Sequence, residues 1–176
     1  MFDEARGSLH GLPIEDLDIT CADLGARGGL DRALGDISRW CSALAFEPEP
    51  SEAERLSRQP DPRWRIVRVL PYAIGGVDGS GTLHLPADMA GASLLPHNNA
   101  LVQRFGRSHL LVDRREVPVE TRTLDSLRRS GDLPRVDYLK IDVEGAEYAI
   151  LEAAPFVLSE CSAIKVECSF LPQRLG

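Results

Sequence analysis

The chain has 176 residues, of which 43% are hydrophobic and 27% are charged. This length suits a single domain with one hydrophobic core, and this composition excludes a disordered chain. The formal net charge is -7, which argues against nucleic acid as a partner, because proteins bind its phosphates with lysine and arginine. We therefore expect one domain over residues 1–176 that binds no nucleic acid.

The first residues and the cysteines indicate where the protein works. Met1–Arg6 contains two acidic residues and no apolar stretch follows it, so we expect no signal peptide. No apolar run approaches the length that spans a membrane. The four cysteines form no CxxC pair and lie in or beside apolar runs, which is typical of buried, reduced thiols. These features predict a soluble, cytoplasmic protein with no membrane partner.

The first predicted unit is a strand, a glycine-rich turn and a helix. Leu17–Ala22 is a short apolar run with β-branched residues, and the segment Asp23–Gly29 that follows it is rich in glycine. Apolar residues then recur at helical spacing from residue 30 to residue 40. This spacing predicts a helix that begins near Leu30 and packs one face against a sheet.

Strands followed by helices continue along the chain. Further strands are predicted at residues 43–46, 66–70, 82–85, 136–143 and 163–168, and helices at 51–56, 124–129 and 146–154. Leu110–Val112 and Val117–Val119 are predicted as short extended pieces, with Pro118 at a sheet edge. Residues 86–107 lack periodicity, which predicts a long loop. The alternation predicts an α/β fold with a doubly wound, mostly parallel sheet.

A ligand of such a sheet lies beyond the carboxyl ends of the strands, so the residues that follow each strand are the candidate site. Gly25 and Gly29 allow the backbone to turn tightly and approach a ligand, and free N–H groups after the turn can receive an anionic group. Glu47 follows the second strand, where its two oxygens can accept both hydroxyls of a ribose. These residues predict a bound nucleoside.

The spacing of the glycines narrows the class of nucleoside. Asp-x-Gly-x-x-x-Gly differs from the G-x-G-x-x-G of dinucleotide sites, and the chain has no G-x-x-x-x-G-K-[ST] run for a triphosphate. A nucleoside without a pyrophosphate fits better than a nicotinamide cofactor. A plain tight turn with no ligand is the remaining alternative.

Five motifs resemble those of the FkbM family of methyltransferases. They are DLGARGG (Asp23 to Gly29), FEP (Phe46 to Pro48), TLDSL (Thr123 to Leu127), LKIDVEGAE (Leu139 to Glu147) and VECSF (Val166 to Phe170), and they extend over most of the chain. The resemblance implies a Rossmann-like methyltransferase fold that binds S-adenosyl-L-methionine. Related sheets have two further strands after the fifth, and this chain has too few residues after Cys168 for that C-terminal pair. We therefore expect a shortened domain.

The resemblance also implies roles for residues of the cofactor site. Asp23, Gly25 and Gly29 lie near the methionine part, and Glu47 holds the ribose. A second group completes the predicted cofactor site: Ala26 in the turn, Arg27 over the ligand carboxylate, Ala73 and Ile74 near adenine, and Asp142 at the amino group. No metal ion is expected.

The proton of the acceptor hydroxyl needs a base, and the sequence offers several. Asp142 and Glu144 lie beside the donor, and His97 and His109 lie in the middle region. We take Asp142, Glu144 and His97 as the catalytic candidates, although a histidine in a loop is more often locally bonded. Glu144 and Glu147 have the alternative role of capping the next helix. The loop at residues 93–95 is expected to close over the site.

These inferences predict an enzyme that methylates a hydroxyl group on a small molecule, natural product or glycan. A catalytically inactive nucleoside-binding or interaction domain is the alternative, because the chain is short. The missing strand pair also leaves an open sheet edge, which predicts a homodimer.

Overall fold

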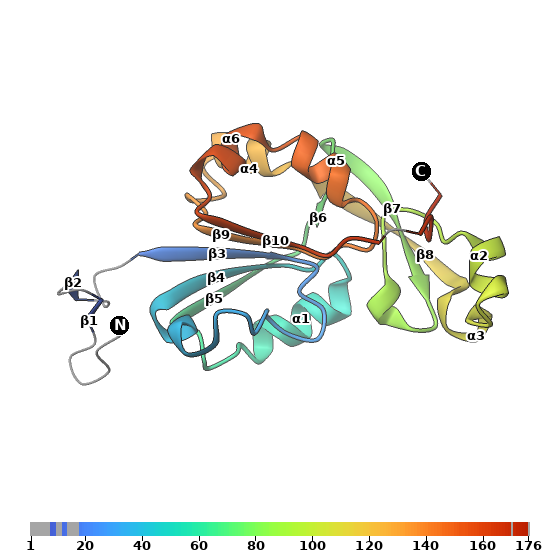
Figure 1. The fold of residues 1–176 in the computed structure, drawn as a ribbon, viewed down its shortest axis with the longest axis horizontal. Helices are drawn as coiled ribbons and strands as arrows, with labels where there is room; N and C mark the ends of the chain where they lie inside the picture. The colour runs from blue at the N-terminus through green and yellow to red at the C-terminus, as the bar shows by residue number, and fades with distance from the viewer. Residues whose placement is uncertain (1–7, 10–11, 14–17, 170, 176) are drawn as a thin grey trace.

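The computed structural model describes residues 8–9, 12–13, 18–169 and 171–175. Its centre is a sheet of five parallel strands in the order β10-β9-β3-β4-β5 (Figure 1). The strands are β3 (Ile19–Leu24), β4 (Cys41–Phe46), β5 (Ile66–Leu70), β9 (Tyr138–Ile141) and β10 (Ala163–Val166). This confirms the predicted α/β fold with a doubly wound sheet, although Leu17 lies outside the described residues.

Helices cover both faces of the sheet (Figure 1). On one face lie α4 (Leu124–Ser130), α5 (Glu147–Glu152) and α6 (Pro155–Glu160), and on the other lies α1 (Pro50–Arg58). Successive strand residues point to opposite faces. Leu24 and Phe46 therefore pack in the core under α4 to α6, while Cys21 and Ala45 pack in the core under α1.

A second, three-stranded sheet stands beyond the carboxyl ends of the central strands (Figure 1). In it β8 (Asp113–Arg122) pairs antiparallel with β7 (Gly79–Pro86) and parallel with the short β6 (Ala73–Ile74). Pro118 faces a partner only on the β7 side, because β6 reaches no further along β8 than Thr121. Around this sheet lie η3 (Met89–Gly91), α2 (Asn99–Arg104) and α3 (Ser108–Leu111), and a separate pair joins β1 (Ser8–Leu9) to β2 (Leu12–Pro13).

The prediction of a helix that begins near Leu30 is wrong. The chain instead makes turns and then one short 3-10 helix, η2 (Gly35–Trp40). Gly28, Gly29 and Gly35 have φ values of 80°, 123° and 46°, which a right-handed helix does not contain. In the same segment, the hydroxyl of Tyr138 donates to the carboxylate of Asp31 at 2.7 Å.

The extended piece predicted at Leu110–Val112 is also wrong for its first two residues, which belong to α3. The amides of Leu110 and Leu111 both donate to the carbonyl of Arg107, at 2.9 and 3.0 Å. A short apolar run does not by its period distinguish a strand from a helical turn.

Among the residues that the structure describes, β5 and β10 are the two edge strands of the central sheet. Within the described part of the chain, β10 pairs only with β9. Within the same residues, no helix has the length and apolar character that crossing a bilayer requires.

Leu139 offers a test of the core, because it lies in β9 with none of its surface exposed. We expect Leu139→Ala to lower the free energy of unfolding by roughly 2 to 5 kcal/mol, because the substitution leaves a cavity between the sheet and the helices. Urea denaturation followed by circular dichroism measures this change. Val77→Ala is the control, since Val77 is 74% exposed. Equal stability of the two variants would contradict the assigned core.

Candidate active site

The site begins at the turn after β3, where Gly25 contacts the loop after β9. Gly25 has a φ of 79°, and a Cβ atom there would lie 1.9 Å from the carbonyl oxygen of Asp142. The amides of Gly25 and Ala26 both donate to the carbonyl of Phe46 at 3.1 Å. Only glycine combines this backbone conformation with so close an approach. The turn is therefore fastened to the ends of β4 and β9 at once.

A lysine that the sequence analysis did not single out joins the strand ends. Nζ of Lys140 lies 3.0 Å from Oδ1 of Asp23 and 3.3 Å from Oδ2 of Asp142, and it donates to the carbonyl of Gly25 at 3.1 Å. Burial raises the pKa of Asp23, and Lys140 opposes that rise. The pKa of Lys140 itself is raised because the two carboxylates outweigh its burial. A lysine within an otherwise apolar strand was the available sequence signal.

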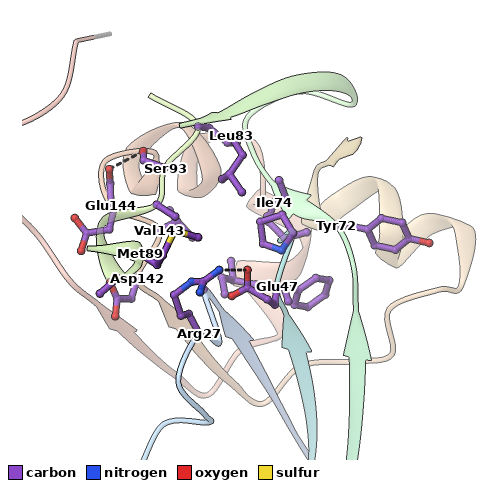
Figure 2. A pocket seen from close by; sticks show the side chains of 18 of the residues that line it. Arg27, Glu47, Tyr72, Ile74, Leu83, Met89, Ser93, Asp142, Val143 and Glu144 are labelled. Atoms are coloured by element: carbon purple, nitrogen blue, oxygen red, sulfur yellow. Dashed lines mark hydrogen bonds and ion pairs between the residues drawn. The ribbon is translucent and has the colours of Figure 1, made fainter. Parts of the chain in front are cut away.

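A cavity of about 190 Å³ opens beyond these strand ends (Figure 2). Seven of the predicted site residues line it: Gly25, Arg27, Glu47, Ala73, Ile74, Asp142 and Glu144. Asp23 and Ala26 are buried and do not line it. Gly29 lies on the wall of a different cavity, which Arg55 and Leu56 of α1 also line. The predicted cofactor residues therefore divide into a lining group and a supporting group.

Glu47 and Arg27 form the charged wall of this cavity. Glu47 is 3% exposed, and its Oε1 accepts the amide of Glu49 at 2.9 Å and lies 3.6 Å from a guanidinium nitrogen of Arg27. Figure 2 shows Arg27 extended toward Glu47 across the edge of the cavity. Burial raises the pKa of Glu47, and the amide and Arg27 oppose that rise. The carboxylate is held in one orientation by its neighbours.

The opposite wall is apolar and comes largely from the second sheet. Ile74, Leu83 and Met89 point into the cavity in Figure 2, from β6, β7 and η3 respectively. Tyr72 borders the same space but directs its ring away from it (Figure 2). Leu83 and Met89 were not predicted as site residues, because nothing local to an added strand or a loop indicates that it folds over the central sheet. An apolar wall opposite a carboxylate suits a flat ring attached to a ribose.

The loop after β9 brings Glu144 to the cavity in an unusual backbone conformation. Glu144 has a φ of 63°, in the left-handed region that side chains other than glycine seldom adopt. The hydroxyl of Ser93 donates to its carbonyl at 2.8 Å, as drawn in Figure 2. Burial raises the pKa of Glu144, and Arg174 opposes that rise. Ser93 and Leu94 line the cavity, so the loop expected to close over the site does reach it.

Glu147 is the acidic residue in the first turn of α5, but among the described residues no side chain caps that helix, and Glu147 bonds the loop before it. Its carboxylate accepts the amides of Val143 at 3.1 Å and Gly145 at 2.9 Å. The carboxylate of Glu144 accepts from Arg174 at 3.1 Å. The two glutamates therefore separate into one that shapes the loop and one that faces the site.

A second cavity of about 480 Å³ adjoins the first. The two share Asp142, Glu144 and Glu167 on their walls. Carboxylate oxygens of these three residues lie within 4.8 Å of one another. Burial, and after it the charges of Asp142 and Glu167, raise the pKa of Glu144. The absence of a metal ion here stays a prediction.

His97 lies elsewhere than on the wall of the first cavity. It is 3% exposed, with Nδ1 2.6 Å from Oδ1 of Asp113 and Nε2 2.6 Å from a guanidinium nitrogen of Arg174. Both ring nitrogens are thus engaged by side chains. His97 belongs to a buried polar network, and no ring nitrogen is left to accept a proton from an acceptor.

Comparison with protein families matches residues 23–176 to the family described as Methyltransferase FkbM domain. The chain belongs to the FkbM methyltransferase family. It is also 24% identical over 145 residues to Hexuronic acid methyltransferase AglP of Haloferax volcanii. The aligned residues make up 82% of this chain. The matched part is 54% of that relative, so the chain spans about half the length of the protein it resembles. No solved structure matches the chain.

Lys140 offers a test of this FkbM site, because two carboxylates depend on it. We expect Lys140→Met to lower the free energy of unfolding by roughly 3 to 5 kcal/mol at neutral pH, since Asp23 is then buried without a cation. The variant should regain stability on acidification, because the pKa of Asp23 is raised in the folded state and the buried carboxylate takes up a proton.

Urea denaturation at several pH values measures both effects. Lys165→Met is the matched control, since Lys165 pairs with Asp31 at the surface and its side chain is 52% exposed. Its loss should cost no more than about 1 kcal/mol. A Lys140→Met variant as stable as this control would contradict the role assigned to Lys140.

Proposed function

We propose that the chain transfers a methyl group from S-adenosyl-L-methionine to a hydroxyl group of a sugar or another small molecule. The observation that carries the proposal is one cavity at the carboxyl ends of β3, β4 and β9. The glycine turn, the Glu47 carboxylate and an apolar wall surround it. Membership of the FkbM methyltransferase family supports the same reaction.

The residues around the cavity suit the parts of this donor. Glu47 offers a fixed carboxylate to the ribose hydroxyls, as proposed from its place after β4. Ala73 and Ile74, with Leu83 opposite, supply an apolar slot for adenine. Gly25 brings the backbone against the cavity, with Arg27 near the donor carboxylate and Asp142 near its amino group. Asp23, Ala26 and Gly29 then support the site through the turn and do not line this cavity.

When bound, the donor supplies a methyl group on a positively charged sulfur. The chain must hold the acceptor oxygen in line with that methyl group and accept the hydroxyl proton. Glu144 and Asp142 are the candidate bases, because both border the two cavities. Burial raises the pKa of Glu144, which makes its carboxylate a stronger base. We assign the proton to Glu144 and the amino group of the donor to Asp142.

The acceptor is proposed by class. The relative AglP is named a hexuronic acid methyltransferase, which supports a sugar as acceptor for this chain too. The second cavity adjoins the donor cavity at Asp142 and Glu144 and has about 480 Å³ of space for such a molecule. Carboxylates on its wall can accept hydrogen bonds from sugar hydroxyls.

Isothermal titration with S-adenosylmethionine and S-adenosylhomocysteine tests the donor site. We expect binding that Glu47→Ala weakens by roughly 1.5 to 3 kcal/mol, about 10- to 150-fold in Kd, because a hydrogen bond to a charged group is lost. Glu54→Ala is the control, since Glu54 lies on α1 with its side chain 60% exposed. A folded protein that binds neither compound would refute the proposal. Binding without transfer to any acceptor would favour the inactive binding domain.

We also propose that the open edge of β10 pairs with a second copy of the chain. An unpaired edge offers free backbone donors and acceptors, and Ile164 on this strand is 44% exposed. Sedimentation velocity should show a dimer, and Ile164→Lys should dissociate it because the lysine charge opposes close pairing. A monomer at every concentration would contradict this proposal.

A further inference from the structure

A buried arginine reaches the acidic loop from the segment Leu171–Leu175. The side chain of Arg174 is 7% exposed, and its guanidinium donates to the carbonyl of Gly91 at 3.0 Å and to Oε2 of Glu144 at 3.1 Å. A further guanidinium nitrogen lies 2.6 Å from Nε2 of His97. A buried guanidinium is costly unless its donors are satisfied, so this set of contacts fixes the side chain.

The partners of His97 determine which ring nitrogen carries the proton. A guanidinium only donates, so Nε2 of His97 must accept from Arg174. The proton therefore lies on Nδ1, which donates to Asp113 at 2.6 Å. Burial and the nearby guanidinium lower the pKa of His97, although Asp113 opposes that change. A neutral imidazole with a fixed tautomer holds Arg174 in place.

The backbone around Arg174 is held as well. Gln173 accepts the amide of Asn98 at 2.8 Å, and the amide of Leu175 donates to Pro96 at 2.9 Å. The side-chain amide of Asn98 donates to the carbonyl of Pro172 at 2.9 Å. The segment is thus fastened to the loop that precedes α2, and Arg174 is constrained at both its backbone and its guanidinium.

Glu144 needs such a partner because of the charges that face it. The negative charges of Asp142 and Glu167 oppose the ionisation of Glu144. The nearby Lys140 forms its ion pair with Asp142. Arg174 is the cation that contacts Glu144 itself. The hydroxyl of Ser93 holds the carbonyl of the same residue. One residue with a left-handed backbone is therefore held at two atoms by segments far away in sequence.

We propose that Arg174 is a positioning residue that keeps the carboxylate of Glu144 ionised and fixed at the border of the two cavities, and that Asp113 and His97 hold Arg174 for this task. The effect of Arg174 on Glu144 is inferred from the contacts alone. The effect of Arg174 on turnover rests on the proposed methyl transfer.

Carboxyl ¹³C NMR of glutamate-labelled protein tests the effect on Glu144, whose signal is assigned with Glu144→Gln. In Arg174→Gln the pKa of Glu144 should rise by roughly 1 to 3 pH units, because an adjacent opposite charge is lost. Arg174→Lys should keep most of the wild-type value. Arg128→Gln is the matched control, since Arg128 pairs with Glu160 on the helical face and should leave Glu144 unchanged. An unchanged pKa in Arg174→Gln would overturn the proposal.

Methyl transfer tests the consequence for catalysis. Arg174→Gln should lower kcat roughly 100-fold, as expected for a displaced reacting group, while the Kd for S-adenosylhomocysteine changes less than about twofold. Arg174→Lys should recover much of the loss. An unchanged kcat together with a raised pKa would overturn the catalytic part. A wild-type chain with no donor binding and no transfer would refute the proposed function. The NMR experiment would still show whether Arg174 controls the pKa of Glu144.

Arg174→Gln alone leaves Glu144 without its cation and can impair folding. The double variant Glu144→Gln with Arg174→Gln removes both charges, so it should be more stable to urea than Arg174→Gln. If the second substitution gives no such recovery, Glu144 and Arg174 are not coupled and the proposal fails.

Discussion

The contacts of Lys140 are the interaction on which the site depends. The chain runs from β3 outward through β4 and β5, then returns to the other side of β3 with β9 and β10. The strand order reverses between β3 and β9, which is where such sheets bind ligands. Asp23 ends one of these strands and Asp142 follows the other, and Lys140 contacts both. Without a cation between them, two carboxylates would repel each other at the floor of the site.

The cavity above this floor is assembled from segments that are distant in the chain. The central sheet supplies the glycine turn and Glu47, and the second sheet folds over them with Ile74 and Leu83. Backbone hydrogen bonds from Gly25 and Ala26 to Phe46 tie the turn to the neighbouring strand. The apolar wall and the charged wall therefore face each other because two separate sheets meet at the strand ends.

Local cations organise the acidic site of a chain whose net charge is -7. Arg27 lies between Glu47 and Glu49, and Lys140 lies between Asp23 and Asp142. Arg174 contacts Glu144 from a third direction. Each of these cations is largely withdrawn from water, where its attraction to a carboxylate is stronger than at the surface. The acidic groups are thereby held in defined orientations at the cavities.

The sequence by itself determined the alternating strands, the family and the members of the candidate site that follow each strand, because these depend on local period and on residues adjacent in the chain. Tertiary structure decided that Lys140 contacts Asp23 and that η2 replaces a predicted helix. It also decided that His97 binds Arg174 and that Leu83 covers the donor cavity. Several of these outcomes depend on contacts between segments 50 or more residues apart. Ser93 and Glu144, for example, are 51 residues apart in the sequence. No local pattern encodes such contacts, since they form only when the two sheets pack together.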